Sequence, residues 1–339
     1  MAKSSTPSIV TIVLNKPVLP QDHPDYESEA EVIETVELIE EALKKSEIQT
    51  ERIMLDRDLA PFWNRMQANK PEVIFNMFEG FADDTESEVH FAGLLDWLKI
   101  PYTGSNSAAI AIGRNKILAK SVLQAAGVST PRFFTIVNTD TIPENNIGWP
   151  LIIKPATQDA SIGIEQASVV TNQEKLEERA KYILNKYGPP VLAEEFIDGR
   201  EFTAAVIEIP ELKVLAPSEV HFPIRDKGLW PIISYDAKWA PESLEFEGTP
   251  YEYPAKISPE LLNKVKKTVA NAYRAIGLRD YGRIDMRISK NETVYVIEAN
   301  PNPDLHVVAG LAISLESVGL TYEDFLRDLV ISTWKRNQD

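Results

Sequence analysis

Two short strands near the C-terminal end of the chain carry its clearest chemical signal. In "RIDMRI", strand alternation places Arg283 and Asp285 on one face. In "TVYVIEAN", it places Glu298 and Asn300 on one face together with the valines of that strand. The "SKNE" between the two runs predicts a turn, so we expect a hairpin whose four polar side chains gather on one surface.

Two registers of this hairpin are open. In the first, Ile288 faces Thr293. Arg283 then lies opposite Glu298, and Asp285 is one diagonal step away. In the second, a slip of two residues places Asp285 directly opposite Glu298.

This set of side chains has the composition of a hard-cation site. Two carboxylates and an amide oxygen suit Mg²⁺, which shares its remaining positions with water and substrate phosphates. The alternative is an ordinary cross-strand ion pair on a solvated face. The "PNP" that follows Asn300 favours a site, because it fixes a rigid loop where the strand leaves its neighbour.

A second pattern, "LIIKPATQDASIG", ends an apolar strand with Lys154 and continues into a loop of small and polar residues. A lysine at this place can meet a phosphate as a point charge while backbone amides of the loop close over it. The loop is not a Walker motif, since no Gly-Lys-Ser/Thr is present. A surface loop with a solvated lysine is the alternative interpretation.

A third pattern, "VLAEEFIDGREF", places Glu194 and Glu195 at consecutive strand positions, so at most one of them points inward. The "DGR" predicts a turn, and Glu201 follows it. A carboxylate in this setting is suited to hold the edge of a base or the hydroxyls of a ribose. Two solvated glutamates on an edge strand are the alternative.

The elements that position these residues follow two patterns. From Ile9 to Leu98, short apolar runs alternate with stretches of helical periodicity, which predicts an α/β unit with a parallel sheet. The two helices expected there span Glu29 to Lys45 and Val89 to Leu98. Farther along, strand pairs are interleaved with single helices, which predicts α+β units built on antiparallel sheet.

Two helices of the second pattern carry end signals. Thr171 with Glu174 predicts a capping box at the start of one helix. Ser258, Pro259 and Gly277 frame another, with proline just inside the start and glycine just past the end.

Composition excludes several classes of function. The 339 residues include 51 acidic and 35 basic ones, a net charge of −16, which argues against nucleic acid as a partner. No cysteine is present, which excludes disulfides and zinc–thiolate sites and favours the cytoplasm. The early apolar run from Ile9 to Leu14 is too short for a membrane span and lacks the basic flank of a signal peptide. We therefore expect neither nucleic acid nor a membrane as a partner.

In order along the chain, "GRNK", "IIKPA", "EEFIDGREF", "RIDMRI" and "EANPNP" resemble motifs of the ATP-grasp superfamily, and "IPYTGSNSAAIAIGRNK" resembles its D-alanine–D-alanine ligase branch. The likeness spans about residues 71 to 330. It implies an ATP-grasp fold with a parallel-sheet α/β domain at 1–103, a central subdomain at 104–190, and a C-terminal subdomain at 191–339 with the metal and substrate sites. It also favours a homodimer.

The resemblance implies roles for single residues. The implied ATP-binding residues are Lys116 and Lys154 at the phosphates, Ser161 in the loop, Glu194, Glu195 and Ile197 at the adenine, and Glu201 at the ribose. The implied metal ligands are Asp285, Glu298 and Asn300, which would bind two Mg²⁺ ions, or Mn²⁺ in their place. The implied catalytic residues are Arg283 at the transferred group, Lys238 at the γ-phosphate, and Glu29 at the first amino group.

The activity implied is the ATP-dependent joining of a small-molecule carboxylate to an amine through an acyl phosphate, with release of ADP. Departures from the family lie on the amino-acid side. Ala160 stands where a hydroxyl is usual, and Trp239 stands at a tyrosine position. Ala309 lies near the place of a serine, and Glu79 replaces a histidine. Buried polar contacts discriminate strongly, so these changes predict a substrate pair other than two D-alanines.

Three alternatives remain open at this point. The first is an authentic D-alanine–D-alanine ligase of cell-wall synthesis. The second is an enzyme that makes an acyl phosphate without an amine acceptor. The third is an ATP-binding sensor or scaffold that has lost catalysis, although Arg283, Asp285, Glu298 and Lys238 are all present.

Overall fold

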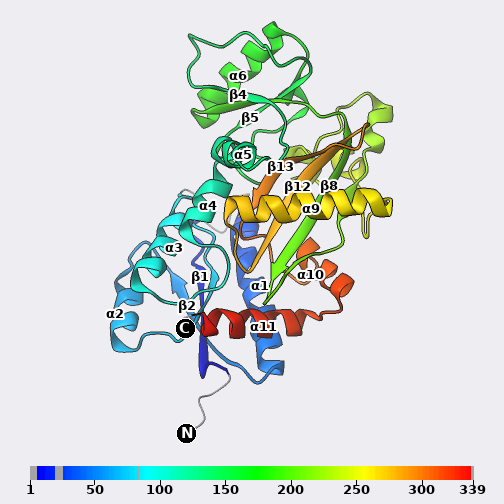
Figure 1. Cartoon of the computed structure of the whole chain (residues 1–339). Coiled ribbons are helices and arrows are strands. Elements are labelled where there is room, and N and C mark those ends of the chain that lie inside the picture. Colours follow the sequence, from blue (N-terminus) through cyan, green and yellow to red (C-terminus); the bar gives the residue numbers. More distant parts are fainter. Residues whose placement is uncertain (1–5, 20–25, 82–83, 337–339) are drawn as a thin grey trace.

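Three β-sheets follow one another along the computed structural model of this chain (Figure 1). The structure describes residues 6–19, 26–81 and 84–336, and for 26–30 the backbone alone. The first sheet is parallel and the other two are antiparallel. The predicted order, an α/β unit followed by α+β units, is therefore confirmed.

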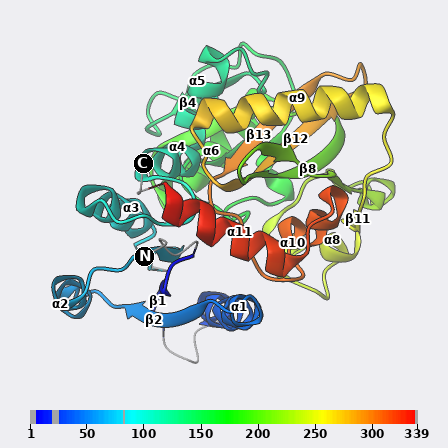
Figure 2. The ribbon, with the colours of Figure 1, turned by 60° about the horizontal axis from the view of Figure 1, so that its bottom comes forward.

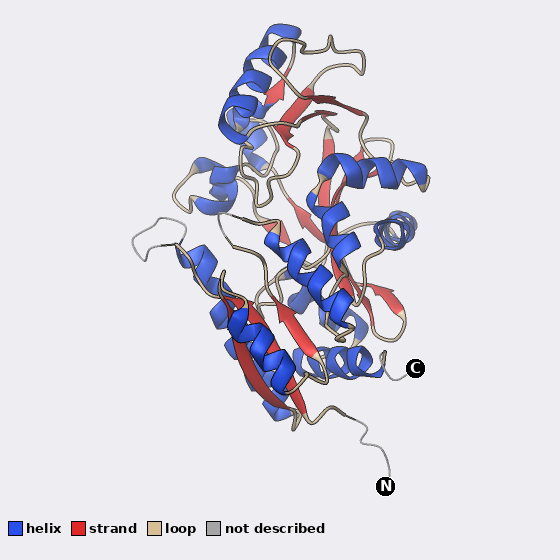
Figure 3. Ribbon diagram, turned by 90° about the vertical axis from the view of Figure 1, so that its left-hand side faces the viewer, coloured by secondary structure: helices blue, strands red, loops and turns tan. Residues whose placement is uncertain are grey.

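In the first sheet, β1 lies between β2 and β3. Its unit contains β1 (Ile9–Asn15), α1 (Tyr26–Lys45), β2 (Gln49–Leu55), α2 (Ala60–Ala68), β3 (Ile74–Met77) and α3 (Ser87–Leu98). Figure 3 shows these strands between helices. Ile12 and Leu14 are buried on the α1 side and Val13 on the side of α2 and α3, so both faces of the sheet are covered.

The second sheet has the order β4–β7–β5–β6 and a core of its own with α6. Its elements are β4 (Phe133–Ile136), β5 (Leu151–Pro155), β6 (Val169–Val170), α6 (Gln173–Tyr187) and β7 (Val191–Glu195), preceded by α4 (Ser107–Arg114) and α5 (Lys116–Ala125). The predicted cap of α6 is wrong by one residue. The side chain of Asn172, not Thr171, accepts the N–H of Lys175 at 2.9 Å, because asparagine is the last residue before the helical backbone begins.

The third sheet has the order β11–β10–β8–β12–β13, and β9 pairs with β8. Its elements are β8 (Gly199–Glu208), β9 (Leu212–Val214), β10 (Ser218–Val220), α7 (Tyr235–Trp239), α8 (Leu244–Glu247), β11 (Tyr251–Glu252), α9 (Pro259–Ile276), β12 (Tyr281–Ser289) and β13 (Val294–Asn300). Helix α9 lies across one face, where it buries Phe202 and Met286 (Figure 1). Ser258 caps α9 and Gly277, at φ +78°, ends it, as predicted.

The chain passes from the second sheet to the third between Glu195 and Gly199. The two strands that flank the predicted turn therefore lie in different sheets rather than in one hairpin. Gly199 begins β8 at a close approach, since a Cβ there would lie 2.0 Å from the carbonyl oxygen of Ile288. The domain boundaries expected at 103/104 and 190/191 stay predictions, and β7 lies beyond the second of them.

The last helices return to the first unit. They are α10 (Gly310–Ser314) and α11 (Tyr322–Lys335), and short 3₁₀ segments lie at Gln166–Ser168, Pro223–Lys227 and Leu315–Val318. Helix α11 packs against α1, and Figure 2 shows it between the first unit and the third sheet. Phe325 and Leu329 share one apolar core with Val36 of α1 and Ile207 of β8. No helix in the described ranges is both long and apolar enough to cross a membrane.

Gly113 lies where α4 meets the loop after β13, and its substitution gives a first prediction. A Cβ at Gly113 would lie 2.4 Å from Cγ of Pro301 and 3.2 Å from the carbonyl oxygen of Ala299. Alanine in place of a helical glycine normally stabilises by about 1 kcal/mol. We expect Gly113→Ala instead to destabilise by about 1–3 kcal/mol, because Pro301 has to move.

Gly93 in α3 is the matched control, because a Cβ there would meet nothing closer than 3.8 Å. Thermal unfolding should therefore move Tm down for Gly113→Ala and up for Gly93→Ala. A rise in both variants would show that the contact with Pro301 is not a constraint.

Candidate nucleotide and metal site

A β-bulge in β13 decides which way its polar residues face. Met286 pairs with Val296 and Asp285 pairs with Glu298, so Ile297 is an extra residue between the two pairs. The extra residue reverses the alternation of the strand. The expectation that the valines share a face with Glu298 is therefore wrong: Val296 is buried against α9, and Glu298 lies on the opposite face with Asp285.

The hairpin itself is present, with Asp285 opposite Glu298 and Arg283 opposite Asn300. At these positions the second of the two open registers is the one observed. Near the turn neither register holds, because Ile288 faces Val294. The bulge accounts for the difference, since it shifts the pairing by one residue between the turn and the site.

Each carboxylate of the hairpin is held by a cation. Nε and Nη2 of Arg283 donate to Asp285 at 2.9 Å each, and the hydroxyl of Thr203 donates to Asp285 at 2.6 Å. Nζ of Lys116 lies 2.9 Å from Oε1 of Glu298. Burial acts to raise the pKa of Glu298, but the charge of Lys116 and of neighbouring cations holds it at about 2. Glu298 is therefore an anion at neutral pH.

The two predicted phosphate lysines come from different elements. Lys116 is the first residue of α5, whose N-cap is Asn115, and Lys154 lies in β5. Burial opposes the charge on Lys116, yet Glu298 and Asp159 raise its pKa above that of an ordinary lysine. Both side chains are buried, so both charges lie in the interior beside the hairpin.

A third lysine, Lys120, was missed by the sequence analysis. Its Nζ lies 2.5 Å from Oε2 of Glu194, and Nζ of Lys154 lies 3.3 Å from Oε1 of the same carboxylate. Burial lowers the pKa of Lys120 to about 8, and Glu194 opposes that shift. The signal was the spacing in "KILAK", because residues four apart share one face of a helix. Lys116 and Lys120 thus approach the site together.

The pair of glutamates in β7 faces opposite ways, as alternation predicts. Glu194 is buried between the two lysines, while Glu195 is partly exposed and accepts from Nε of Arg132 at 2.9 Å. Two lysines lower the pKa of Glu194 despite its burial. The adenine contacts expected of both residues stay predictions. The observed partners of Glu194 are Lys120 and Lys154.

Ile197 and Glu201 lie beside a second residue that the sequence analysis gave no role. Oε2 of Glu201 lies 3.0 Å from Nε of Arg287, and Nη1 of Arg287 donates to the carbonyl of Ile197 at 3.1 Å. Alternation along β12 places Arg287 on the same face as Asp285. This shared face was the one feature of the sequence that could have pointed to Arg287.

Two loops meet over the polar face. The hydroxyl of Ser161 donates to the carbonyl of Ile233 at 3.0 Å, and the indole of Trp239 donates to the carbonyl of Ala160 at 3.0 Å. Ala160 and Ser161 both have positive φ, a conformation that these contacts help to hold. Ser161 is therefore engaged with the opposite loop rather than with the lysines.

Lys238 and Trp239 are neighbours in the short helix α7. The side chain of Lys238 is exposed, yet partial loss of hydration and the nearby charge of Arg283 lower the pKa of this lysine. Glu29 lies in α1, but its side chain is outside the described residues, so its predicted contact stays a prediction.

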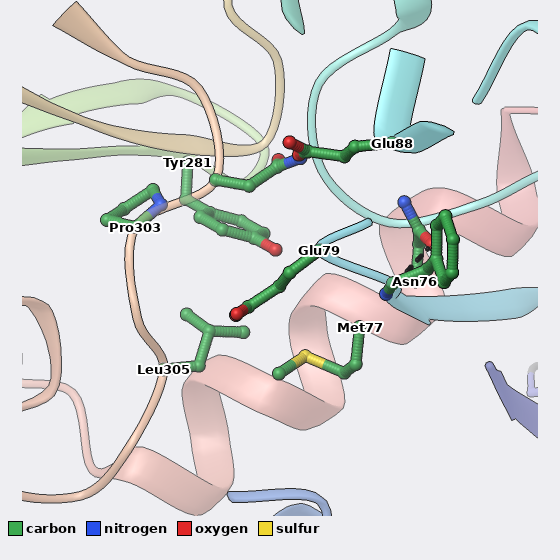
Figure 4. A pocket seen from close by; sticks show the side chains of 9 residues that line it. Asn76, Met77, Glu79, Glu88, Tyr281, Pro303 and Leu305 are labelled. Carbon is green, nitrogen blue, oxygen red and sulfur yellow. Dashed lines mark hydrogen bonds between the residues drawn. The ribbon is translucent and has the colours of Figure 1, made fainter. Parts of the chain in front are cut away.

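A small cavity separates the end of β3 from the loop after Asn300, and Glu79 points into it (Figure 4). Solvent reaches the carboxylate of Glu79. Its crowded setting and the charge of Glu88 nevertheless raise the pKa of Glu79 to about 7. Glu88 itself is paired with Arg114 at 2.9 Å and accepts from Nδ2 of Asn302 at 3.1 Å. Glu79 and Glu88 therefore both line the cavity, and Arg114 neutralises Glu88.

Known proteins resemble this chain over most of its length. The family model described as D-ala D-ala ligase C-terminus matches residues 122–331. The D-alanine–D-alanine ligase of Desulforudis audaxviator is 31% identical over 70% of this chain and 74% of its own. That of Ralstonia nicotianae is 30% identical over 76% and 73%. An uncharacterized protein of Sinorhizobium fredii, y4sG, is 27% identical over 76% and 73%.

Solved structures agree on the fold. The D-alanine–D-alanine ligase from Bacillus anthracis complexed with ATP superposes with a TM-score of 0.74 at 21% identity and covers 97% of this chain and 98% of its own. The VanG D-Ala:D-Ser ligase from Enterococcus faecalis gives 0.72 at 18% identity over 97% and 99%. The family match and the 31% identity together show that this chain belongs to the D-alanine–D-alanine ligase family of ADP-forming ATP-grasp ligases, which form an amide bond.

Proposed function

We propose that this ligase uses ATP and two Mg²⁺ ions to join a small-molecule carboxylate to an amine, and that the two substrates are not both D-alanine. The observation that carries the proposal is the polar face on which Asp285 lies opposite Glu298, with Arg283 and Lys116 in contact with the two carboxylates. This face combines ligands for a hard cation with cations for a phosphate.

The donor set fits a divalent cation. Two carboxylates and the amide oxygen of Asn300 are hard oxygen ligands, and they lie at the end of one hairpin. Each carboxylate is paired with one cation of the protein. When a metal ion and a phosphate bind together, the metal can take the place of that cation at the carboxylate, and the phosphate can pair with the cation. Bound Mg²⁺ would neutralise the phosphates and polarise the transferred group.

The chain's own residues then bind and orient the reactants. Lys116 and Lys154 hold phosphate oxygens, and Arg283 faces the group in transfer. The substrate carboxylate attacks the γ-phosphorus and ADP leaves. The amine next attacks the acyl carbon, loses a proton and expels phosphate. The loops that carry Ser161 and Trp239 exclude water from the acyl phosphate.

The substrate side supports a pair other than two D-alanines. At Glu79 a carboxyl group stands where the family has a histidine, so this position offers an acid in place of an imidazole. Ala309 is the N-cap of α10 and offers no side-chain oxygen there. The indole N–H of Trp239 is already donated to the carbonyl of Ala160, so the rest of the ring presents mainly an apolar surface.

The decisive experiment is ADP release with Mg-ATP against L- and D-amino acids, singly and in pairs, with mass spectrometry of the products. We expect release that requires one particular pair, and a product lighter than the sum of that pair by one water. Turnover with D-alanine alone would overturn the substrate assignment. Release without dependence on an amine would indicate acyl-phosphate synthesis, and ATP binding without turnover would indicate a non-catalytic module.

The metal assignment predicts the effect of neutral isosteres. We expect Asp285→Asn and Glu298→Gln each to lower Mg²⁺-dependent ATP turnover by about 100-fold or more, because each removes an anionic ligand. Thermal unfolding should show that both variants stay folded.

Glu219→Gln is the matched control for these variants. Glu219 is also a buried carboxylate paired with an arginine, Arg200, in the same sheet. Glu219 pairs in register with Phe202, so the two side chains share the face that α9 covers. Asp285 and Glu298 lie on the other face of the sheet. Turnover should survive in Glu219→Gln, and turnover that also survives in both Asp285→Asn and Glu298→Gln would refute the metal site.

The lowered pKa of Lys238 predicts where kcat begins to fall at alkaline pH. A lysine with a depressed pKa loses its charge at a lower pH than an ordinary lysine, so kcat should begin to fall earlier as the pH rises. In Lys238→Arg the charge persists, and the alkaline fall should move to higher pH. An identical pH profile for the two proteins would exclude Lys238 as the titrating group.

A further inference from the structure

We propose that Arg287 makes the nucleotide site select a ribose, because its guanidinium holds Glu201 and the carbonyl of Ile197 in place. The inference rests on the proposed function, since it takes Glu201 as the acceptor of the ribose hydroxyls. Arg287 acts through Glu201 and is therefore a positioning residue.

The guanidinium of Arg287 is bound on three sides. Arg287 is 4% exposed. Its Nε lies 3.0 Å from Oε2 of Glu201, its Nη1 donates to the carbonyl of Ile197 at 3.1 Å, and its Nη2 donates to the carbonyl of Pro231 at 2.5 Å. Two segments, residues 197–201 and the loop at Pro231, therefore converge on one side chain of β12.

Aromatic rings fix the plane of this group. Cζ of Arg287 lies 4.9 Å from the ring centre of Phe196 and 5.4 Å from that of Phe222. Phe196 in turn packs edge-on against Trp230 at 5.5 Å. The rings attract the cation and shield it from water. A lysine lacks the planar fork needed to make all three polar contacts at once.

The orientation of Glu201 depends on these contacts. Among the described residues, Arg287 is the cation within ion-pair distance of Glu201, and it uses Oε2. The other oxygen, Oε1, is the one that we assign to a ribose hydroxyl. A buried carboxylate that loses its only paired cation is strongly disfavoured, so without Arg287 the side chain is expected to leave this position. Selection for the hydroxyl should be lost with it.

The test compares Mg-ATP with Mg-2′-deoxy-ATP by isothermal titration calorimetry on the full chain. We expect the unaltered protein to bind ATP about tenfold more tightly, the contribution of about one hydrogen bond to a charged group. In Arg287→Met this ratio should fall to about one, and in Arg287→Lys it should fall only in part. The conservative lysine variant also keeps the test open if the methionine variant does not fold.

Arg279→Met is the matched control. Arg279 also donates to two backbone carbonyls, those of Gly104 at 2.7 Å and Tyr102 at 3.2 Å, and its Cζ lies 4.5 Å from the ring centre of Tyr102. Its loss should lower Tm but leave the nucleotide ratio unchanged, because it does not contact Glu201.

The outcomes separate the two claims. Equal binding of both nucleotides by the unaltered protein, or an unchanged ratio in Arg287→Met and Arg287→Lys, overturns the role of Arg287 while the ligase function stands. If the unaltered protein binds neither nucleotide, the ATP-dependent function itself is overturned.

Discussion

The bulge at Ile297 is the constraint on which the rest of the site depends. A regular β13 would place Glu298 in the apolar layer under α9, among Ile284, Met286 and Val296 and on the face away from Asp285. One extra residue keeps Val296 in that layer and brings Glu298 beside Asp285. The strand can thus anchor the sheet with its first half and present charges with its second half. Bulges next to functional sites commonly re-aim a side chain in this way.

The carboxylates of the site are paired with cations of the protein before any ligand arrives. Glu298 neutralises Lys116, Asp285 neutralises Arg283, and Glu194 lies between two lysines. Such pairs cost desolvation but avoid isolated buried charge. When a metal ion and a phosphate enter together, the metal can pair with the carboxylates and the phosphate with the lysines and the arginine. The net charge of the interior then changes little. The arrangement also explains how a chain with a net charge of −16 can present cations to a nucleotide.

The parts of the fold and the site that depend on residues close together in sequence could be predicted. Proline and glycine set the ends of α9, and alternation identified the polar face of β12. The bulge was not predictable, because Ile297 suits either face of a strand and only packing of the valines forces the shift. The ion pair of Lys120 with Glu194 joins residues far apart in sequence, so no local pattern reports it. The "DGR" is an ordinary turn signal, yet tertiary packing assigns its two strands to different sheets.

The shared core of α11 and α1 has a mechanical consequence. Phe325 and Ile207 belong to the same apolar cluster as the first sheet, so a close-packed core joins the first unit to the third sheet. The second sheet keeps a separate core with α6 and meets α5 partly through the ion pair of Lys120 with Glu194. If the second sheet moves relative to the other two, the connection from Glu195 to Gly199 is where the chain has to bend, because the cores on its two sides are separate.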